Sequence, residues 1–325
     1  SPGHGDAFPY SHPLYAGQVG PRGNAVASDL AKQADVILAL GTRLGFNTTF
    51  YLRESLNPSA KIIQTDTEAT AIGRFCPIAI GIQGNAGCIS EGLICELADH
   101  KVGTETQHWT ETFAGRRTAL LNMRDQENAT GTDPIQPGFL FKTLRDIAPD
   151  DAIYTMDAGT LCLQATDQLR YMQTPSLFTP LDFGLVGFSY ACGLGAKIGQ
   201  PDRTVISLMG DGGFGMACSE LGTAVENGIN TVCIVMNNGC WGAEKAYQRD
   251  FFGQRYIGAD VINPPFDKLA ELWGAKGFKV NHAAELAEVV TAAIECGRPA
   301  VVDVRVDPAA LFSFRKDSFK NRAGK

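Results

Sequence analysis

A Gly-Asp-Gly triplet, Gly210-Asp211-Gly212, stands at the end of an apolar segment and is followed 24 residues later by the pair Asn237-Asn238. The segment 202–209 ends in an apolar run long enough for one buried parallel strand, and 231–236 is typical of a second. The residues between them, 213–227, are predicted to form a helix. Because a strand, a helix and another strand follow one another directly, this part of the chain is constrained to a parallel α/β sheet.

The polar residues of this motif follow the carboxyl ends of the two predicted strands. Asp211 comes after the first strand and Asn238 after the second. Ligands bind at that edge of an open α/β sheet. A carboxylate, an amide oxygen and a backbone carbonyl form a hard, oxygen-only set suited to Mg²⁺ or Ca²⁺. Neighbouring glycines let backbone N–H groups approach phosphate oxygens closely. The motif therefore predicts a divalent cation together with a diphosphate.

The same alternation of strands and helices extends over most of the chain. The first part offers strands at 34–40, 61–65 and 78–82, with helices at 24–33 and 88–97. The second part offers, in order, helix 139–147, strand 152–156, helix 187–198, the unit that carries the metal motif, helix 266–274, strand 276–280, helix 285–296 and strand 300–306. This order predicts an α/β protein with two doubly wound parallel-sheet domains.

Composition limits the classes of function. A length of 325 residues suits two domains. The net charge of −7 argues against a nucleic-acid partner. The sequence contains no apolar run of 18 residues, so we expect no membrane-spanning helix. Nine scattered cysteines without a CxxC pair predict reduced, mostly buried thiols in a cytoplasmic protein. The chain starts at Ser1 rather than Met, so we expect a piece of something longer or a cleavage product.

The whole motif resembles the thiamine diphosphate (ThDP) binding motif of the acetolactate synthase and 2-oxo acid decarboxylase superfamily. The resemblance implies a Rossmann-like middle domain at 1–100 that lacks its start, a linker at 101–136, and a diphosphate-binding domain with a C-terminal tail at 137–325. Within the linker, 109–123 could still form a helix. The cofactors implied are ThDP and Mg²⁺.

The resemblance also assigns ligands. Asp211 and Asn238 would bind the metal through their side chains, and Cys240 through its carbonyl oxygen. Gly159 and Thr160 would offer N–H groups to the diphosphate. The carbonyl of Gly184 would accept a hydrogen bond from the aminopyrimidine, and Val186 would be the apolar wedge that bends the cofactor, unless it is an ordinary core residue. The remaining cofactor contacts implied are Gly210, Gly212, Gly213, Trp241 and Gly242.

Some members of the superfamily bind FAD or an adenine nucleotide in the middle domain. Arg43 and Asp66 stand where such contacts occur. We favour the interpretation that Arg43 and Asp66 form an ordinary ion pair. The nucleotide-like fold would then hold no FAD or ADP.

The resemblance further implies that an essential group lies outside these residues. In the superfamily, a Glu on a pyrimidine-binding domain activates the cofactor, usually from a neighbouring subunit. The catalytic residues therefore remain unknown in this chain. We expect it to work only with that domain, supplied by the same full-length chain or by a partner subunit, in a homodimer or homotetramer.

The segment Trp241-Gly242-Ala243-Glu244-Lys245 resembles the sulfoacetaldehyde acetyltransferase branch of the superfamily. The reaction implied converts sulfoacetaldehyde and phosphate to acetyl phosphate and sulfite. Both substrates are anions, so cationic side chains after the metal motif are candidates to bind them. These candidates are Lys245, Arg249, Arg255 and Arg315.

Other functions stay open on the sequence alone. The nearest is an acetolactate synthase-like enzyme, or another 2-oxo acid decarboxylase or carboligase. A non-catalytic subunit that keeps the cofactor fold is a second, and the intact Asp211 and Asn238 argue against it. A plain nucleotide-binding domain is a third, but the chain lacks a GxGxxG fingerprint.

Overall fold

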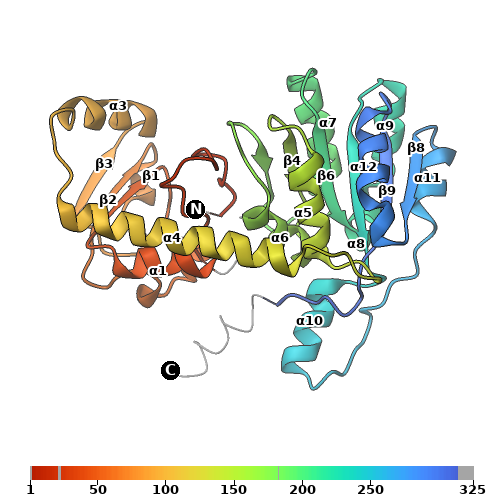
Figure 1. Ribbon diagram of the computed structural model, residues 1–325, viewed down its shortest axis with the longest axis horizontal. Coiled ribbons are helices and arrows are strands. Elements are labelled where there is room, and N and C mark those ends of the chain that lie inside the picture. The colour runs from red at the N-terminus through yellow and green to blue at the C-terminus, as the bar shows by residue number, and fades with distance from the viewer. Residues whose placement is uncertain (1, 21–22, 182, 314–325) are drawn as a thin grey trace. The chain divides into compact units, whose positions relative to one another are not determined.

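The computed structural model describes residues 2–20, 23–181 and 183–313 (Figure 1). The chain divides into two units, one made of Ser1–Pro2 and Pro13–Leu121 and the other of Gly3–His12 and Asn122–Lys325. Each unit has its own sheet, of three and of six strands, and every strand pairing is parallel. Two parallel-sheet α/β domains were predicted, and the structure confirms that fold class.

The first unit holds a sheet in the order β1-β2-β3. Its strands are β1 (Val36–Leu40), β2 (Lys61–Asp66) and β3 (Ile80–Gln83). The helical elements around them are α1 (Ala25–Gln33), α2 (Phe46–Thr49), η1 (Arg53–Ser55), η2 (Ala69–Ala71) and α3 (Ala86–Glu96). Asn24 and Asn85 accept hydrogen bonds from backbone N–H groups at the starts of α1 and α3, as good N-caps do. A small apolar core forms around Ala39, Leu44 and Ile62.

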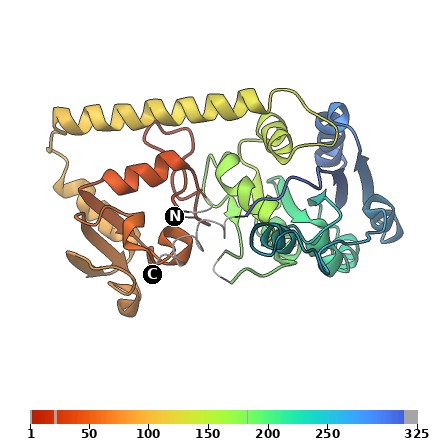
Figure 2. The same ribbon diagram turned by 90° about the horizontal axis from the view of Figure 1, so that it is seen from below.

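The residues predicted as a linker are mostly helical. α4 (Thr104–Glu127) is one helix of 24 residues and occupies most of 101–136 (Figure 2). It buries only Phe113 among its side chains, so its sequence carries almost no apolar periodicity. The boundary between the two units falls inside this helix, at Leu121.

The second unit contains the six-stranded sheet, in the order β5-β4-β6-β7-β9-β8. Its strands are β4 (Ile153–Met156), β5 (Leu177–Phe178), β6 (Val205–Gly210), β7 (Val232–Asn237), β8 (Lys276–Val280) and β9 (Ala300–Arg305). The central strands β4, β6 and β7 are almost wholly buried. They read as continuous apolar runs because helices cover both faces of a parallel sheet.

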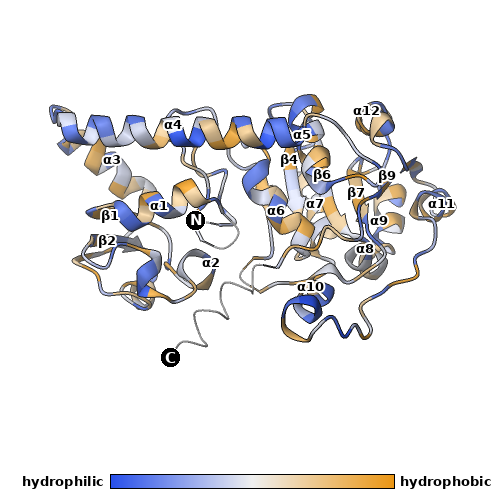
Figure 3. Ribbon diagram, turned by 60° about the horizontal axis from the view of Figure 1, so that its bottom comes forward, coloured by the Kyte–Doolittle hydropathy of each residue, from blue (hydrophilic) through white to orange (hydrophobic). Residues whose placement is uncertain are grey.

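Two apolar cores lie on the two faces of this sheet (Figure 1). One face packs against α5 (Pro137–Ile147), α6 (Thr160–Gln168) and α12 (Leu286–Glu295). The other packs against α7 (Phe188–Gly199), α8 (Asp211–Ala217), α9 (Glu220–Glu226) and α11 (Phe266–Leu272). Neighbouring residues of β6 serve opposite faces, since Leu208 belongs to the first core and Met209 to the second. Strand β7 is accordingly one of the clearly hydrophobic segments in Figure 3.

The second unit differs from the predicted elements in three places. The single helix predicted at 213–227 is two helices, α8 and α9, that break at 218–219. α6 follows the loop after β4, and α10 (Gly242–Phe251) follows the loop after β7. Neither helix was predicted. Strand β5 has only two residues, too few to leave an alternating pattern.

The structure also tests the expected burial of the cysteines and the expected absence of a membrane-spanning helix. All nine cysteines are free, but only Cys162, Cys233 and Cys240 are buried, so the prediction of mostly buried thiols was wrong. Within the described part of the chain, no helix combines the length and the apolar character needed to cross a membrane.

Residues 3–12 pack with the second unit, although we predicted 1–100 as one domain. The buried carboxylate of Asp6 accepts hydrogen bonds from the N–H groups of Ser176 (2.8 Å) and Leu177 (3.2 Å), at the start of β5. Leu181 lies beside Gly3, since a Cβ built on that glycine would come 3.1 Å from it. The segment therefore supports the loop that leads from β5 toward α7.

We expect Asp6→Ala to lower the thermal unfolding midpoint of the second unit by several degrees. The change leaves two buried N–H groups without an acceptor, and each unsatisfied group costs about 1–3 kcal/mol. One kcal/mol corresponds to about 2–4 °C in a domain of this size. Differential scanning calorimetry measures the shift. The matched control is Asp202→Ala, at an exposed position, and an equal effect of both changes would contradict the role of Asp6.

Candidate functional site

Three neighbouring strands bring their polar carboxyl ends to one edge of the six-stranded sheet. β4 lies beside β6, and β6 beside β7, with Met156 opposite Leu208 and Gly210 opposite Met236. Asp157, Asp211 and Asn238 follow these three strands directly and are buried. The register therefore places the predicted metal ligands on adjacent loops, as expected for this edge of the sheet.

Oxygen atoms converge at the junction of the second and third loops. The amide atom of Asn238 that faces into the site lies 3.0 Å from the carbonyl oxygen of Cys240 and 3.3 Å from Oδ1 of Asp211. With the amide oxygen inward, it accepts a hydrogen bond from the N–H of Cys240 at 3.3 Å. Three oxygens then face one another with no proton between them. With the nitrogen inward, the amide would instead donate to both oxygens.

Most of the buried charge is acidic. Among the described residues, the charged residues that are buried as a whole are six aspartates: Asp6, Asp157, Asp167, Asp211, Asp267 and Asp303. The side chain of Arg145 is also buried, at 6% exposure, and it pairs with Asp125. Burial raises the pKa of the Asp211 carboxyl above its ordinary value, against hydrogen bonds from Asn263 and from the backbone of Gly212 and Gly239 that lower it. A carboxylate in this position is therefore short of positive charge, which a bound cation would supply.

A chain of side-chain hydrogen bonds runs behind Asp211. Nδ2 of Asn263 donates to Oδ2 of Asp211 at 2.6 Å and lies 3.2 Å from Oδ1 of Asn237. Nδ2 of Asn237 donates in turn to Asp303 on β9 at 2.9 Å. Sequence reasoning missed Asn263, because Asn263-Pro264 has the composition of an ordinary turn.

Two helices begin beside Asn238. α6 starts at Thr160 after Gly159, α10 starts at Gly242 after Trp241, and neither start has a side-chain cap. A Cβ built on Gly242 would lie 3.4 Å from Oγ1 of Thr160 and 3.4 Å from Nδ2 of Asn238. The uncapped N–H groups of two helices therefore lie next to the converging oxygens. That arrangement suits the oxygens of a diphosphate.

Close packing explains why the triplet contains glycines. A Cβ on Gly212 would lie 2.6 Å from the ring of Trp241, and one on Gly213 would lie 2.1 Å from Oδ2 of Asp157. Asp157 itself accepts hydrogen bonds from the N–H groups of Gly187 (3.1 Å) and Phe188 (2.9 Å) at the start of α7. Asp157 therefore caps α7, and Gly213 leaves room for that cap. Around Gly210 and Gly159 there is open space instead.

The loop before α7 is open on one side. Gly184 has a φ of +71°, which favours glycine, and it is exposed. Val186 is half-buried, and its Cγ1 would lie 3.5 Å from a Cβ on Gly213. Val186 therefore lies beside the triplet, while Phe183 and Leu185 are exposed next to it. The roles implied for Gly184 and Val186 with the cofactor stay predictions.

The thiol of Cys240 is a poor metal ligand at neutral pH. Burial raises its pKa to about 11, although nearby Lys245 lowers it. The carbonyl oxygen of Cys240 lies 3.0 Å from the inward amide atom of Asn238, and its role as a metal ligand stays a prediction. The described residues contain no group of three or more His, Cys, Asp or Glu side chains placed to hold a metal ion. The converging oxygens of Asp211, Asn238 and Cys240 have another composition: one carboxylate, one side-chain amide and one backbone carbonyl.

The basic residues predicted to bind substrate have different surroundings. Lys245 pairs with Asp260 at 2.5 Å, and Arg249 pairs with Asp250 at 2.8 Å. Arg255 is exposed and donates to the carbonyl of Phe252 at 3.2 Å. Arg315 lies outside the described residues. Two of the four cations are therefore already balanced by carboxylates.

In the first unit, the residues that we compared with a nucleotide site are tied to their own loops. Asp66 accepts a hydrogen bond from the N–H of Glu68 at 2.9 Å. No ion pair among the described residues joins it to the exposed Arg43, so the ordinary ion pair that we favoured was wrong. The side chain of Gln64 donates to the carbonyl of Thr42 (2.9 Å) and accepts from the N–H of Gly73 (2.7 Å). These contacts connect the loop after β1 to the residues that follow β2, and FAD or ADP binding stays untested.

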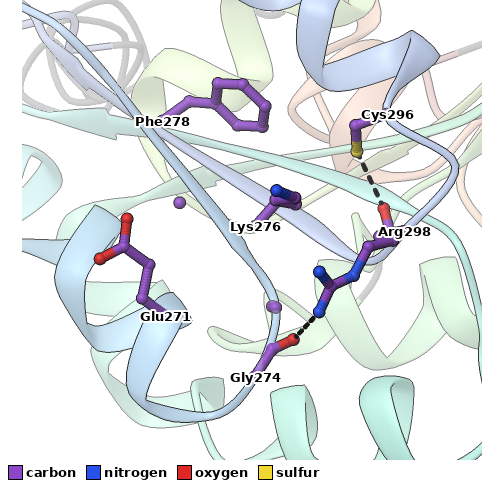
Figure 4. A pocket seen from close by; sticks show the side chains of 8 residues that line it. Glu271, Gly274, Lys276, Phe278, Cys296 and Arg298 are labelled. Atoms are coloured by element: carbon purple, nitrogen blue, oxygen red, sulfur yellow. Dashed lines mark hydrogen bonds between the residues drawn. The ribbon is translucent and has the colours of Figure 1, made fainter.

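A groove lies at the opposite end of the six-stranded sheet, where β8 and β9 begin (Figure 4). Within it, Arg298 donates to the carbonyl of Gly274 at 2.6 Å, and Glu271, Lys276 and Phe278 line its wall. The converging oxygens lie at the carboxyl ends of the strands, where ligands of parallel sheets bind. The groove lies at the other end of the strands, so it is separate from these oxygens.

Comparison with known proteins gives matches for both units. Residues 1–93 match the model of the thiamine pyrophosphate enzyme central domain. Residues 157–304 match the model of the thiamine pyrophosphate enzyme C-terminal TPP binding domain. The two matches together span most of the chain.

Three curated relatives illustrate the similarity. Sulfoacetaldehyde acetyltransferase of Alcaligenes xylosoxydans xylosoxydans is 32% identical, over 96% of this chain and 56% of the relative. The enzyme of the same name from Castellaniella defragrans is 28% identical, over 97% and 56%. A probable acetolactate synthase large subunit of Methanococcus aeolicus is 29% identical, over 93% and 52%. The chain spans about half the length of these relatives.

We expect Gly213→Ala to destabilise the second unit strongly. The new methyl group would lie 2.1 Å from the Asp157 carboxylate, so the cap of α7 would have to move. Gly215→Ala in the same helix is the matched control, because a Cβ there meets nothing within 4 Å. It should leave stability unchanged or raise it by up to about 1 kcal/mol. Thermal unfolding measures both variants. An equal fall of their unfolding midpoints would contradict this account.

Proposed function

Because the chain belongs to the thiamine pyrophosphate enzymes, we propose that it carries the metal- and diphosphate-binding part of an acetyltransferase. The reaction converts sulfoacetaldehyde and phosphate to acetyl phosphate and sulfite. The observation that carries the proposal is the convergence of three oxygens beside two uncapped helix starts. The choice of substrate rests on similarity to relatives named sulfoacetaldehyde acetyltransferase.

The donor set fits magnesium. Mg²⁺ binds oxygens at about 2.0–2.1 Å in an octahedron, so neighbouring ligand oxygens lie about 3.0 Å apart. The inward atom of Asn238 lies 3.0 Å from the Cys240 oxygen and 3.3 Å from the Asp211 oxygen. Asp211, Asn238 and Cys240 would therefore hold Mg²⁺, and the cation would neutralise the buried Asp211. Such ions usually keep other positions for substrate phosphates and water, which suits a diphosphate.

The chain's own residues divide the remaining work. When bound, ThDP supplies a carbon nucleophile that adds to a carbonyl group and stabilises the negative charge that develops. The N–H groups at the starts of α6 and α10 would orient the diphosphate near Gly159 and Gly242. The ring of Trp241 packs against Gly212 and would cover that side of the loop. Val186 would support the bend of the cofactor, and the carbonyl of Gly184 would accept from its amino group.

Both proposed substrates are anions, and α10 starts at the metal motif. Arg255 has no carboxylate partner among the ion pairs of the described residues, so it is the best placed of the predicted cations to bind a sulfonate or phosphate. Lys245 and Arg249 would first have to exchange Asp260 and Asp250 for the substrate. We keep Arg315 as a fourth candidate.

The proposal needs a group from outside the chain. A carboxylic acid, a Glu of a pyrimidine-binding domain, would activate the cofactor's pyrimidine ring. It would come from the same full-length chain or from a partner subunit in a homodimer or homotetramer. We place the protein in the cytoplasm, where its nine free cysteines would stay reduced.

An acetolactate synthase-like decarboxylase or carboligase is the second candidate. It is favoured by the relative from Methanococcus aeolicus, which has 29% identity over 93% of the chain. Such an enzyme would use pyruvate, release carbon dioxide and need no phosphate. The two candidates share the proposed metal and diphosphate site and differ only in the acyl donor and acceptor.

The complete protein, supplied with Mg²⁺ and ThDP, should release sulfite from sulfoacetaldehyde only when phosphate is present. Acetyl phosphate should form in equal amount, because one acetyl group is transferred for each sulfite that leaves. Colorimetric assays of both products check the result. Carbon dioxide from pyruvate, with no sulfite from sulfoacetaldehyde, would favour the second candidate and overturn the first.

We expect Asp211→Asn to abolish the stabilisation that Mg²⁺ and ThDP give together. Bound ligand at a hundredfold excess over its Kd stabilises a folded protein by about 2.7 kcal/mol. Without ligands, the variant should be at least as stable as the original at pH 7. The pKa of Asp211 is raised by folding, so ionisation of this carboxyl above its unfolded pKa weakens the free fold. Thermal unfolding with and without both ligands measures these effects.

The exposed Asp202 provides the control for this experiment, and Asp202→Asn should keep the full shift of the midpoint. A shift of normal size in Asp211→Asn would contradict the assignment of the metal site. It would leave the substrate assay as a separate question.

A further inference from the structure

We propose that Asn263 is a positioning residue that holds Asp211 in the orientation needed to bind the cation. The inference rests on the proposed function of the site and adds a residue that neither the sequence motif nor the comparisons indicate. Its physical basis is a directed chain of hydrogen bonds that begins at a buried carboxylate on β9.

Asn263 connects the ends of two adjacent strands. Its Nδ2 donates to Oδ2 of Asp211 after β6 at 2.6 Å, and lies 3.2 Å from Oδ1 of Asn237 at the end of β7. The two N–H bonds of this one nitrogen have two acceptors. The nitrogen therefore acts as a donor on both sides and is not available to bind a cation.

The direction of these hydrogen bonds is fixed from the other end. Asp303 is 2% exposed, and an ionised carboxylate only accepts hydrogen bonds. Its Oδ1 accepts from Nδ2 of Asn237 at 2.9 Å, and its Oδ2 accepts from the N–H of Phe266 at 3.3 Å. The amide of Asn237 must therefore point its nitrogen at Asp303 and its oxygen at Asn263. That oxygen in turn requires a donor, so Asn263 presents its nitrogen toward both Asn237 and Asp211.

The two oxygens of Asp211 therefore have different partners. Oδ2 is engaged by Asn263, and Oδ1 lies 3.3 Å from the inward amide atom of Asn238. The terminal torsion of an aspartate is broad and nearly two-fold, so the carboxylate plane is weakly fixed by its own backbone. A donor on Oδ2 fixes that plane and leaves Oδ1 toward the proposed cation. Partners of this kind in metal sites are worth a large part of the affinity.

The loop that carries Asn263 is itself anchored. It leads into α11, whose first residue, Phe266, is fully buried. The ring of Phe266 packs edge-on against Phe214 of α8 with centroids 5.1 Å apart. Phe214 lies one turn after Asp211 in the same helix. The donor and its acceptor are therefore held on elements that pack directly against each other.

The test uses the complete protein with ThDP in excess and Mn²⁺ as the probe of the metal site. Electron paramagnetic resonance measures free Mn²⁺ and gives the Kd without any assay of activity. We expect Asn263→Ala to raise the Kd for Mn²⁺ about 10–100-fold, the usual effect of losing an outer-sphere partner. Asn263→Leu, which keeps a similar side-chain volume but supplies no N–H donor to Asp211, should raise the Kd by a similar factor. Asn281→Ala, at an exposed position, is the matched control and should leave the Kd unchanged.

A purely structural role would give a different pattern. For a positioning role, the KM for Mg²⁺ rises, while kcat at saturating Mg²⁺ stays within about twofold of the original, since a high metal concentration compensates for weaker binding. A structural defect lowers kcat and is not rescued by metal. An unaltered Kd in both Asn263 variants, or losses that saturating metal does not restore, would overturn the inference and leave the proposed function intact. Failure of the unaltered protein to bind Mn²⁺ at all would overturn both.

Discussion

The burial of Asp211 is the constraint on which the rest of the site depends. An acidic side chain that is 1% exposed and has no basic partner among the ion pairs of the described residues must obtain compensation from elsewhere. Part of it comes from hydrogen bonds of Asn263 and of the backbone. The remainder is available from a cation, because the oxygens of Asn238 and Cys240 face the same point. A bound cation would therefore stabilise this carboxylate.

The sheet produces this arrangement with few residues. Parallel pairing of β4, β6 and β7 puts three loops side by side, and each loop continues into a helix. The glycines allow those helices to begin where side chains would collide, as Gly213 does beside Asp157 and Gly212 beside Trp241. The chain of hydrogen bonds from Asp303 through Asn237 and Asn263 ends on Oδ2 of Asp211. The sheet register, the glycine packing and the hydrogen-bond chain thus all determine where the carboxylate of Asp211 lies.

The sequence was sufficient for the parallel sheets and for placing Asp211 and Asn238 at the ends of two strands, because buried parallel strands are long apolar runs and both residues follow such a run directly. The metal itself stays a prediction. It was insufficient where the signal is tertiary. α4 buries one side chain and shows little periodicity, so it was taken for a linker. α10 was interpreted by its charges rather than as a helix, and Lys245 and Arg249 turn out to be paired with Asp260 and Asp250. The sequence alone could not identify Asn263, because its partner Asp211 lies 52 residues away in the chain.

The most direct test of the central claim is a crystal structure of the complete protein grown with Mn²⁺ and ThDP, with anomalous scattering recorded at the manganese edge. The account predicts one strong anomalous peak in contact with Oδ1 of Asp211, the amide oxygen of Asn238 and the carbonyl oxygen of Cys240. The diphosphate should complete the coordination beside the starts of α6 and α10. A bound cofactor whose metal lies away from these three oxygens, with Asp211 still hydrogen-bonded only to protein, would contradict the account.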